Sequence, residues 1–162
     1  MCIRFIHKIL YLGLLVFIIS CNQQSESYSE EEIKEHSAEL NEYFEEEFQK
    51  DVEESPMMQP RLGQKTNYGK WDNFSHLKYA EDRNKAKRRL GDLKKIDPSS
   101  LDEETRLSYD LYLQKQENLL EDYDFRFYNY PVNQMFGYHA ELPAFLINMH
   151  RIDSISDAEA YI

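Results

Sequence analysis

The sequence lacks most of the motifs that mark a self-contained enzyme. It has two cysteines and one tryptophan, and it contains no Gly-x-Ser-x-Gly, Walker A or Gly-x-Gly-x-x-Gly pattern. The helical zinc motif His-Glu-x-x-His is also absent. Catalysis by these 162 residues alone is therefore not expected.

A hydrophobic run long enough for a comfortable membrane span is missing as well. The apolar run Ile9–Ile19 has eleven residues, whereas a transmembrane helix needs about 20. The run follows Arg4 and Lys8 and ends at Ser20-Cys21, which is typical of a lipoprotein signal peptide with its lipobox. We expect the segment before Cys21 to be removed and the Cys21 thiol to carry lipid, so that the chain contacts a membrane through an acyl anchor.

The cysteine count agrees with this interpretation. Cys2 would leave with the signal peptide (residues 1–20) and Cys21 would be acylated, so no thiol remains for a disulfide, a metal cluster or a nucleophile. Asn22 replaces the aspartate associated with inner-membrane retention in some bacteria, which favours the outer membrane of the cell envelope. The alternative is an ordinary secreted protein cleaved near Ser20.

The charge balance is acidic. With 19 basic and 30 acidic residues, the formal net charge is −11, and such a chain is a poor partner for nucleic acid. A polar tether is expected over residues 21–28, followed by the amino-terminal helical portion of a larger domain over residues 29–162.

Helical periodicity dominates the mature chain, and the predicted fold class is all-α. The capping box of Ser29 and Glu32 opens a helix that ends before Pro56, and residues 55–73 form a long irregular connection. A second helix should run from Ser75 to about residue 96, and a third from a cap at Ser99 or Ser100 to about residue 122.

The second helix is rich in lysine and arginine. A phosphate-binding face is one interpretation, but a solvated face or ion pairs with the acidic first helix require no ligand and are preferred.

Aromatic residues are dense between residues 123 and 138, where they can fill the helical core or line a cleft for sugars or peptides. Core packing is preferred. A further helix should open at Pro143, with one buried apolar face made of Leu142, Phe145, Leu146, Met149 and Ile152.

The last element shows a capping box of Ser156 and Glu159 and is followed by the end of the sequence at Ile162. Such a short helix favours a truncated chain over a naturally frayed terminus. His139, Glu141 and His150 have no helical ligand spacing, since Pro143 interrupts the stretch, so no cofactor or metal is expected within this chain.

A family resemblance rests on several sequence stretches: Leu107–Asp110 (LSYD), Tyr130–Gly137 (YPVNQMFG), Leu142–Leu146 (LPAFL), His150 and Asp157–Ile162 (DAEAYI). From about residue 40 to 162 the chain resembles the amino-terminal region of the bacterial domain-of-unknown-function 885 family. The resemblance implies a longer, often lipid-anchored protein similar to zincin metallopeptidases, with its zinc and its His-Glu-x-x-His helix far downstream. No catalytic or zinc-binding residue is carried over, because those positions lie outside this sequence.

Two function classes follow. In the first, the chain forms a wall of the substrate cleft of a lipid-anchored, peptidase-like hydrolase, and Asn133, Gln134, Gly137 and His139 contact the peptide substrate. Asn and Gln at a turn can instead satisfy local backbone groups. In the second, the chain is a cell-surface lipoprotein whose tyrosines bind glycans or other solutes without catalysis. A purely structural role is a third alternative.

Overall fold

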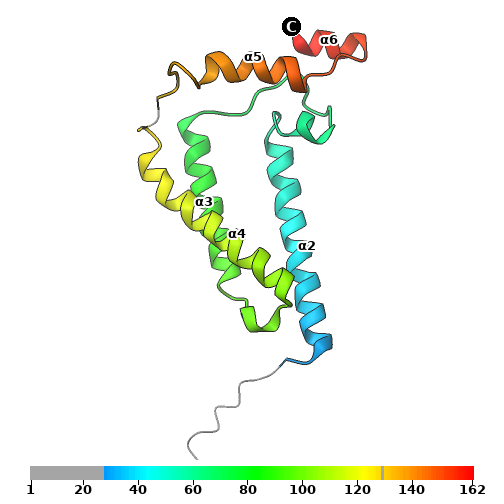
Figure 1. The fold of residues 1–162 in the computed structure, drawn as a ribbon, viewed down its shortest axis with the longest axis vertical. Coiled ribbons are helices and arrows are strands. Elements are labelled where there is room, and N and C mark those ends of the chain that lie inside the picture. Colours follow the sequence, from blue (N-terminus) through cyan, green and yellow to red (C-terminus); the bar gives the residue numbers. More distant parts are fainter. Residues whose placement is uncertain (1–27, 129) are drawn as a thin grey trace, which may run out of the picture. The chain divides into compact units, whose positions relative to one another are not determined.

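The computed structural model describes residues 28–128 and 130–162, and over these residues the protein is all-α, as predicted (Figure 1). The described β-structure is one isolated antiparallel bridge between Val132 and Gly137. None of the described helices is both long and apolar enough to cross a membrane. The expected signal peptide and Cys21 lie outside the described residues.

The first described helix, α2, spans Glu30–Glu54, as the capping box and Pro56 predicted. The long connection after it contains the 3₁₀ helix η1, Gln59–Leu62. The next helix, α3, spans His76–Leu93, and the Ser75 side chain accepts a hydrogen bond from the Lys78 N–H. This confirms the predicted start of α3, whereas its end lies earlier than predicted because residues 94–96 form turns.

The helix α4 spans Glu103–Asp122, and the predicted cap at Ser99 or Ser100 is wrong. Asp102 is the N-cap, because its Oδ1 accepts the Thr105 N–H at 2.7 Å. The two serines belong to the preceding 3₁₀ helix η2, Pro98–Ser100, which Asp97 caps. Aspartate and serine are comparable N-caps, so spacing alone did not separate the two starts.

Leu40, Leu93, Leu101 and Tyr109 form the buried hydrophobic core, and residues from α2 and α4 pack around them. The Tyr109 hydroxyl donates to the Leu93 carbonyl oxygen at 3.2 Å and so ties α4 to the end of α3. Polar contacts also join α2 to the start of α4, where the Asn41 side chain donates to the Thr105 hydroxyl at 3.0 Å.

After the 3₁₀ helix η3, Tyr123–Phe125, the chain reaches α5, Tyr138–Met149. Pro143 lies inside α5 and does not open it, which corrects the predicted start. A proline there removes one helical hydrogen bond, but the Gly137 carbonyl already accepts the N–H groups of Ala140 and Glu141 in the first turn.

The predicted apolar face of α5 is buried only in part. Phe145 is buried, and Leu142, Leu146 and Met149 are half-buried. Ile152 is 55% exposed, which corrects its predicted burial, since it lies beyond the end of the helix.

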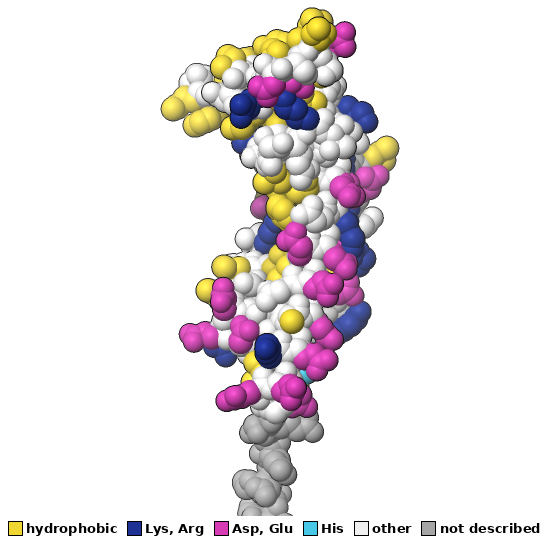
Figure 2. Space-filling model, turned by 90° about the vertical axis from the view of Figure 1, so that its right-hand side faces the viewer, with side chains coloured by type: hydrophobic (Ala, Val, Ile, Leu, Met, Phe, Trp, Pro, Cys, Tyr) yellow, Lys and Arg dark blue, Asp and Glu magenta, His cyan; other side chains and the backbone are white. Residues whose placement is uncertain are grey.

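The last helix, α6, spans Ile155–Tyr161. Its cap is Ser154, whose hydroxyl accepts the Asp157 N–H at 3.2 Å, and not the predicted Ser156. In the view of Figure 2, hydrophobic side chains gather at the end where α5 and α6 lie, and acidic and basic side chains intermix below them.

Candidate binding groove

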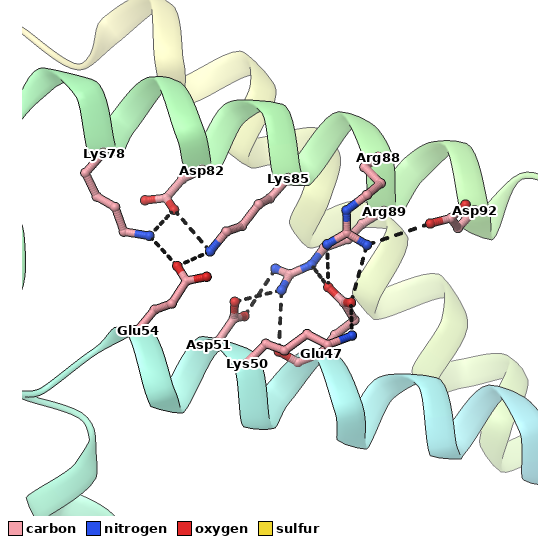
Figure 3. Close-up of polar contacts among 10 residues, drawn as sticks. All are labelled: Glu47, Lys50, Asp51, Glu54, Lys78, Asp82, Lys85, Arg88, Arg89 and Asp92. Atoms are coloured by element: carbon pink, nitrogen blue, oxygen red, sulfur yellow. Dashed lines mark hydrogen bonds and ion pairs between the residues drawn. The ribbon is translucent and has the colours of Figure 1, made fainter. Parts of the chain in front are cut away.

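The basic face of α3 pairs with the acidic face of α2 (Figure 3). Glu47 accepts hydrogen bonds from Arg88 Nη2 at 2.9 Å and from Arg89 Nε at 2.7 Å, and Arg89 Nη2 also donates to Asp51 at 2.7 Å. The Glu47 side chain is 1% exposed and that of Arg89 is 5% exposed. Ion pairing with the first helix, one of the two preferred interpretations of the basic helix, is confirmed for these residues.

A second group of ion pairs continues along the same two helices. Lys78 Nζ donates to Glu54 and to Asp82, each at 2.7 Å, and Lys85 Nζ also donates to Glu54. Burial lowers the pKa of Lys78, but these two carboxylates outweigh it and the net shift is upward. The pairs fix the orientation of the first turns of α3.

The connection between α2 and α3 is held by specific polar contacts. Asp72 accepts hydrogen bonds from the Ser55 hydroxyl at 2.9 Å and from the Met57 N–H at 2.8 Å. The buried Gln59 side chain donates to the Val52 carbonyl and accepts the Asn67 N–H, each at 3.0 Å. These contacts set the path of the chain toward α3.

A separate cluster attaches this connection to the C-terminal helices. Lys65 Nζ donates to Asp157 at 2.7 Å, and this bond, together with the Asp153 N–H bond to the same carboxylate, lowers the pKa of Asp157 to about 2. The Tyr68 ring stacks on the His150 ring at 3.9 Å, and His150 Nε2 lies 2.9 Å from the Asp157 carbonyl oxygen. His150 is therefore a buried packing residue in this part of the chain.

The candidate site is a groove of about 820 Å³ between the start of α3, the end of α4 and the segment that enters α5. Two ring pairs connect its sides: Phe74 with Tyr138 at 5.3 Å, and His76 with Phe127 at 4.9 Å between centroids. The remaining lining residues are Tyr79, Asp82, Arg83, Leu119, Asp122, Tyr123, Arg126, Tyr130, Pro131, Phe136, Gly137 and Glu141.

An adjoining hollow lengthens the groove. Its volume is about 380 Å³, and it shares Phe74, Tyr138 and Glu141 with the groove. Met57 and Arg61 line its other side. The two depressions together suit an extended ligand better than a compact one.

The aromatic residues between residues 123 and 138 are largely exposed, so the preferred interpretation that they fill the helical core is wrong. Tyr130 is 82% exposed and Phe136 is 63% exposed. The turn that carries them is short and closed on itself, with the Asn133 N–H donating to the Phe136 carbonyl at 2.9 Å. The rings therefore line the groove and do not enter the core between α2, α3 and α4.

The structure brings only one of the four predicted substrate-contacting residues into the groove, Gly137. Its φ is 132°, and a Cβ there would stand 2.5 Å from the Pro131 carbonyl oxygen, so the turn itself requires glycine. The Asn133 side-chain oxygen accepts the N–H groups of Met135 and Phe136 at 2.8 Å, which satisfies local backbone.

Gln134 and His139 are exposed and do not line the groove. Sequence reasoning missed Phe74, Arg83 and Arg126, which do. No local signal marks them, since Phe74 precedes a helix cap and Arg83 lies in a run of basic residues. Only the packing of distant segments places them together.

A metal site is not formed by the described residues. Over residues 28–128 and 130–162, no three histidine, cysteine, aspartate or glutamate side chains are arranged to hold an ion. The resemblance assigns its zinc to a His-Glu-x-x-His helix downstream of this sequence, and the described residues form no second site for it.

Comparison with known proteins places the chain in one family. Residues 56–162 match the family described as "Bacterial protein of unknown function (DUF885)". The chain belongs to this DUF885 family. The match begins later than the predicted residue 40 and includes every residue that lines the groove. No curated protein and no solved structure matches the chain.

Proposed function

We propose that this chain is the amino-terminal part of a lipid-anchored, peptidase-like hydrolase, in which the groove forms one wall of the substrate cleft. The observation that carries the proposal is the groove itself, with aromatic and charged side chains along two adjoining hollows. Binding sites of about 300–1,000 Å³ with apolar walls and a few polar groups are typical of small-ligand recognition.

The groove residues are suited to hold a peptide and not to cleave it. Phe74, Phe127 and Phe136 offer rings to apolar side chains, and the Glu141 carboxylate can accept hydrogen bonds from peptide N–H groups. A hydrolytic zinc would be held by other residues of a longer protein, because the described residues do not fit a zinc site.

Membrane attachment through Cys21 is part of the same proposal, with placement in the outer membrane of the cell envelope. Metabolic labelling with a fatty-acid analogue tests it. Wild-type protein should incorporate the label and partition with membranes, and Cys21→Ser should do neither. Equal labelling of the two proteins would contradict the lipid anchor.

The hydrolase proposal is tested by reading the coding DNA beyond codon 162. An open frame that continues to a His-Glu-x-x-His helix supports it, and a stop codon or a continuation without that motif overturns it. The longer protein should then cleave unstructured peptides and lose this activity with a zinc chelator, whereas residues 1–162 alone should be inactive.

Glycan binding without catalysis is the second candidate, favoured by the exposure of the Tyr130 and Phe136 rings. Exposed aromatic rings are suitable platforms for the apolar faces of sugars. Titration with soluble cell-wall glycan fragments separates the two, because saturable glycan binding, together with an open frame that holds no downstream His-Glu-x-x-His motif, supports this candidate against the hydrolase.

A further inference from the structure

Two arginines of the groove stack on one aromatic ring. The guanidinium carbon of Arg83 lies 4.7 Å from the Tyr123 ring centroid, and that of Arg126 lies 4.0 Å from it. Arg126 also lies 4.3 Å from the Phe127 centroid. Both arginines are half-buried, and Tyr123 therefore gathers two positive charges in the groove.

These two charges have no ion-pair partner in the described part of the chain. No carboxylate over residues 28–128 and 130–162 approaches Arg83 or Arg126 within 4.0 Å, although Arg88 and Arg89 both pair with Glu47 on the same helix, α3. Partly buried cations without a counterion are favourable sites for an anionic ligand group.

Stacking leaves the hydrogen-bonding edge of a guanidinium available. A guanidinium that stacks on a ring keeps its N–H donors pointing outward in its own plane. Arg126 uses Nη1 to donate to the Tyr123 carbonyl at 2.6 Å, and its other donors, which have no acceptor among the described residues, remain for a ligand. A planar guanidinium matches the two oxygens of a carboxylate in a bidentate arrangement.

The surrounding charges favour one carboxylate over a larger anion. Asp82, Asp122 and Glu141 line the same groove, and the chain has a net charge of −11. A doubly charged phosphate or a polyanion would meet more repulsion from these groups than a single carboxylate does. The rings of Phe127 and Phe136 lie in the same groove and can contact an apolar side chain beside the carboxylate.

We infer that Arg83 and Arg126, held on Tyr123, form a carboxylate-binding subsite for a peptide that carries an aromatic or large apolar residue next to that carboxylate. The peptide nature of the ligand rests on the proposed hydrolase function. The recognition of a carboxylate rests on the geometry of the two arginines alone.

The test is calorimetric titration of the full chain in detergent with acetyl-Ala-Ala-Phe, as the free acid and as the C-terminal amide. We expect the acid to bind about tenfold more tightly, the scale of one charge-assisted hydrogen-bonded pair. Arg126→Gln should weaken binding of the acid to the level of the amide and leave the amide unchanged. A third peptide, acetyl-Ala-Glu-Phe amide, shows whether a side-chain carboxylate replaces the terminal one.

Arg106→Gln is the matched control, since Arg106 is exposed on α4 outside the groove and its loss changes the net charge equally. It should bind the acid as wild type does. Arg83→Gln and Arg126→Lys provide second variants with circular dichroism as the check of folding. Absence of binding, equal affinity for acid and amide, or equal losses in Arg106→Gln and Arg126→Gln would each overturn the carboxylate subsite.

Failure of this subsite is distinguishable from failure of the proposed hydrolase function. Selective binding of the acid by this chain, when the open frame beyond codon 162 stops or lacks a His-Glu-x-x-His motif, retains the subsite and removes the hydrolase. Peptidase activity with no preference for the acid retains the hydrolase and removes the subsite.

Discussion

Helix α3 uses its arginines in two different ways. Arg88 and Arg89 face α2, where Arg89 pairs with Glu47 and Asp51 and the half-exposed Arg88 pairs with the buried Glu47. Arg83, less than two turns earlier, lies over an aromatic ring and lines a groove. The comparison shows that ion pairing on one side of a helix stabilises the fold, and that cations without a partner on another side remain available for a ligand.

The loss in the free energy of unfolding caused by a substitution should differ between the ion pairs of α2 and α3 and the groove. A buried charge that loses its partner pays a large desolvation penalty, whereas a half-exposed arginine on a ring returns to water at little cost. Stability measurements should therefore separate the paired region from the groove.

The largest effect is expected for Glu47→Ala, which removes the buried carboxylate shared by Arg88, Arg89 and Lys50 and leaves Arg89 with Asp51 as its remaining ion-pair partner. We expect a loss of about 3–5 kcal/mol in the free energy of unfolding, measured by urea denaturation. Glu46→Ala is the control, because the Glu46 carboxylate is 60% exposed and lies 3.6 Å from Lys50. It should cost less than about 1 kcal/mol, and equal losses in the two variants would contradict the role of burial.

The same network predicts a dependence of stability on pH. Burial raises the pKa of Glu47, but hydrogen bonds from Arg88, Arg89 and Lys50 outweigh it and lower the pKa from 4.5 to about 2. The stabilisation is therefore complete above pH 4.5 and is lost as the pH falls toward 2. Urea denaturation across this range should show a steeper decline for wild type than for Glu47→Gln, and parallel profiles would contradict it.

An intermediate effect on stability is expected at the turn that ends at Gly137, before α5. Gly137→Ala places a Cβ 2.5 Å from the Pro131 carbonyl oxygen, at a φ of 132°, and should cost about 1–3 kcal/mol. The control Gly91→Ala lies within α3 with no heavy atom within 4 Å of the added Cβ, and should be stabilising by about 0.5–1 kcal/mol. Thermal unfolding of both variants measures the difference. An unchanged stability of Gly137→Ala would contradict the requirement for glycine at this turn.

The smallest effect is expected for Arg126→Gln, which removes the cation stacked on Tyr123 and Phe127. An exposed cation–ring contact contributes about 0.5–1 kcal/mol, so the unfolding free energy should change by no more than this. A loss as large as that of Glu47→Ala would show that the groove arginines are structural, and the comparison between the two regions would fail.

Much of the helical organisation could be predicted from local sequence. The bounds of α2 and the start of α3 agree with the expected cap at Ser29, the cap at Ser75 and the position of Pro56, because caps and prolines act within one helical turn. The pairing of the basic α3 with the acidic α2 also followed from charge pattern, although the partners of each arginine did not.

The predicted helix starts are wrong where two nearby residues each give a local signal for the start. Asp102 caps α4 in place of Ser99 or Ser100, and Ser154 caps α6 in place of Ser156. Each alternative is a good cap a few residues away, and the choice depends on which start lets the helix pack. Pro143 was placed at a helix start by its known preference, but the turn closed by Gly137 begins α5 earlier.

The sequence by itself determined the all-α class, the family and the charge complementarity of α2 and α3, because these depend on periodicity and composition along continuous stretches. The position and the lining of the groove depend on the tertiary structure alone. Phe74, Arg83 and Arg126 belong to segments that are separate in the chain, and their approach depends on how α3 packs on α4 and on where the turn before α5 lies. Of the four residues chosen from local chemistry, only Gly137 reaches the groove, since proximity in sequence does not specify which side chains face one another across a fold.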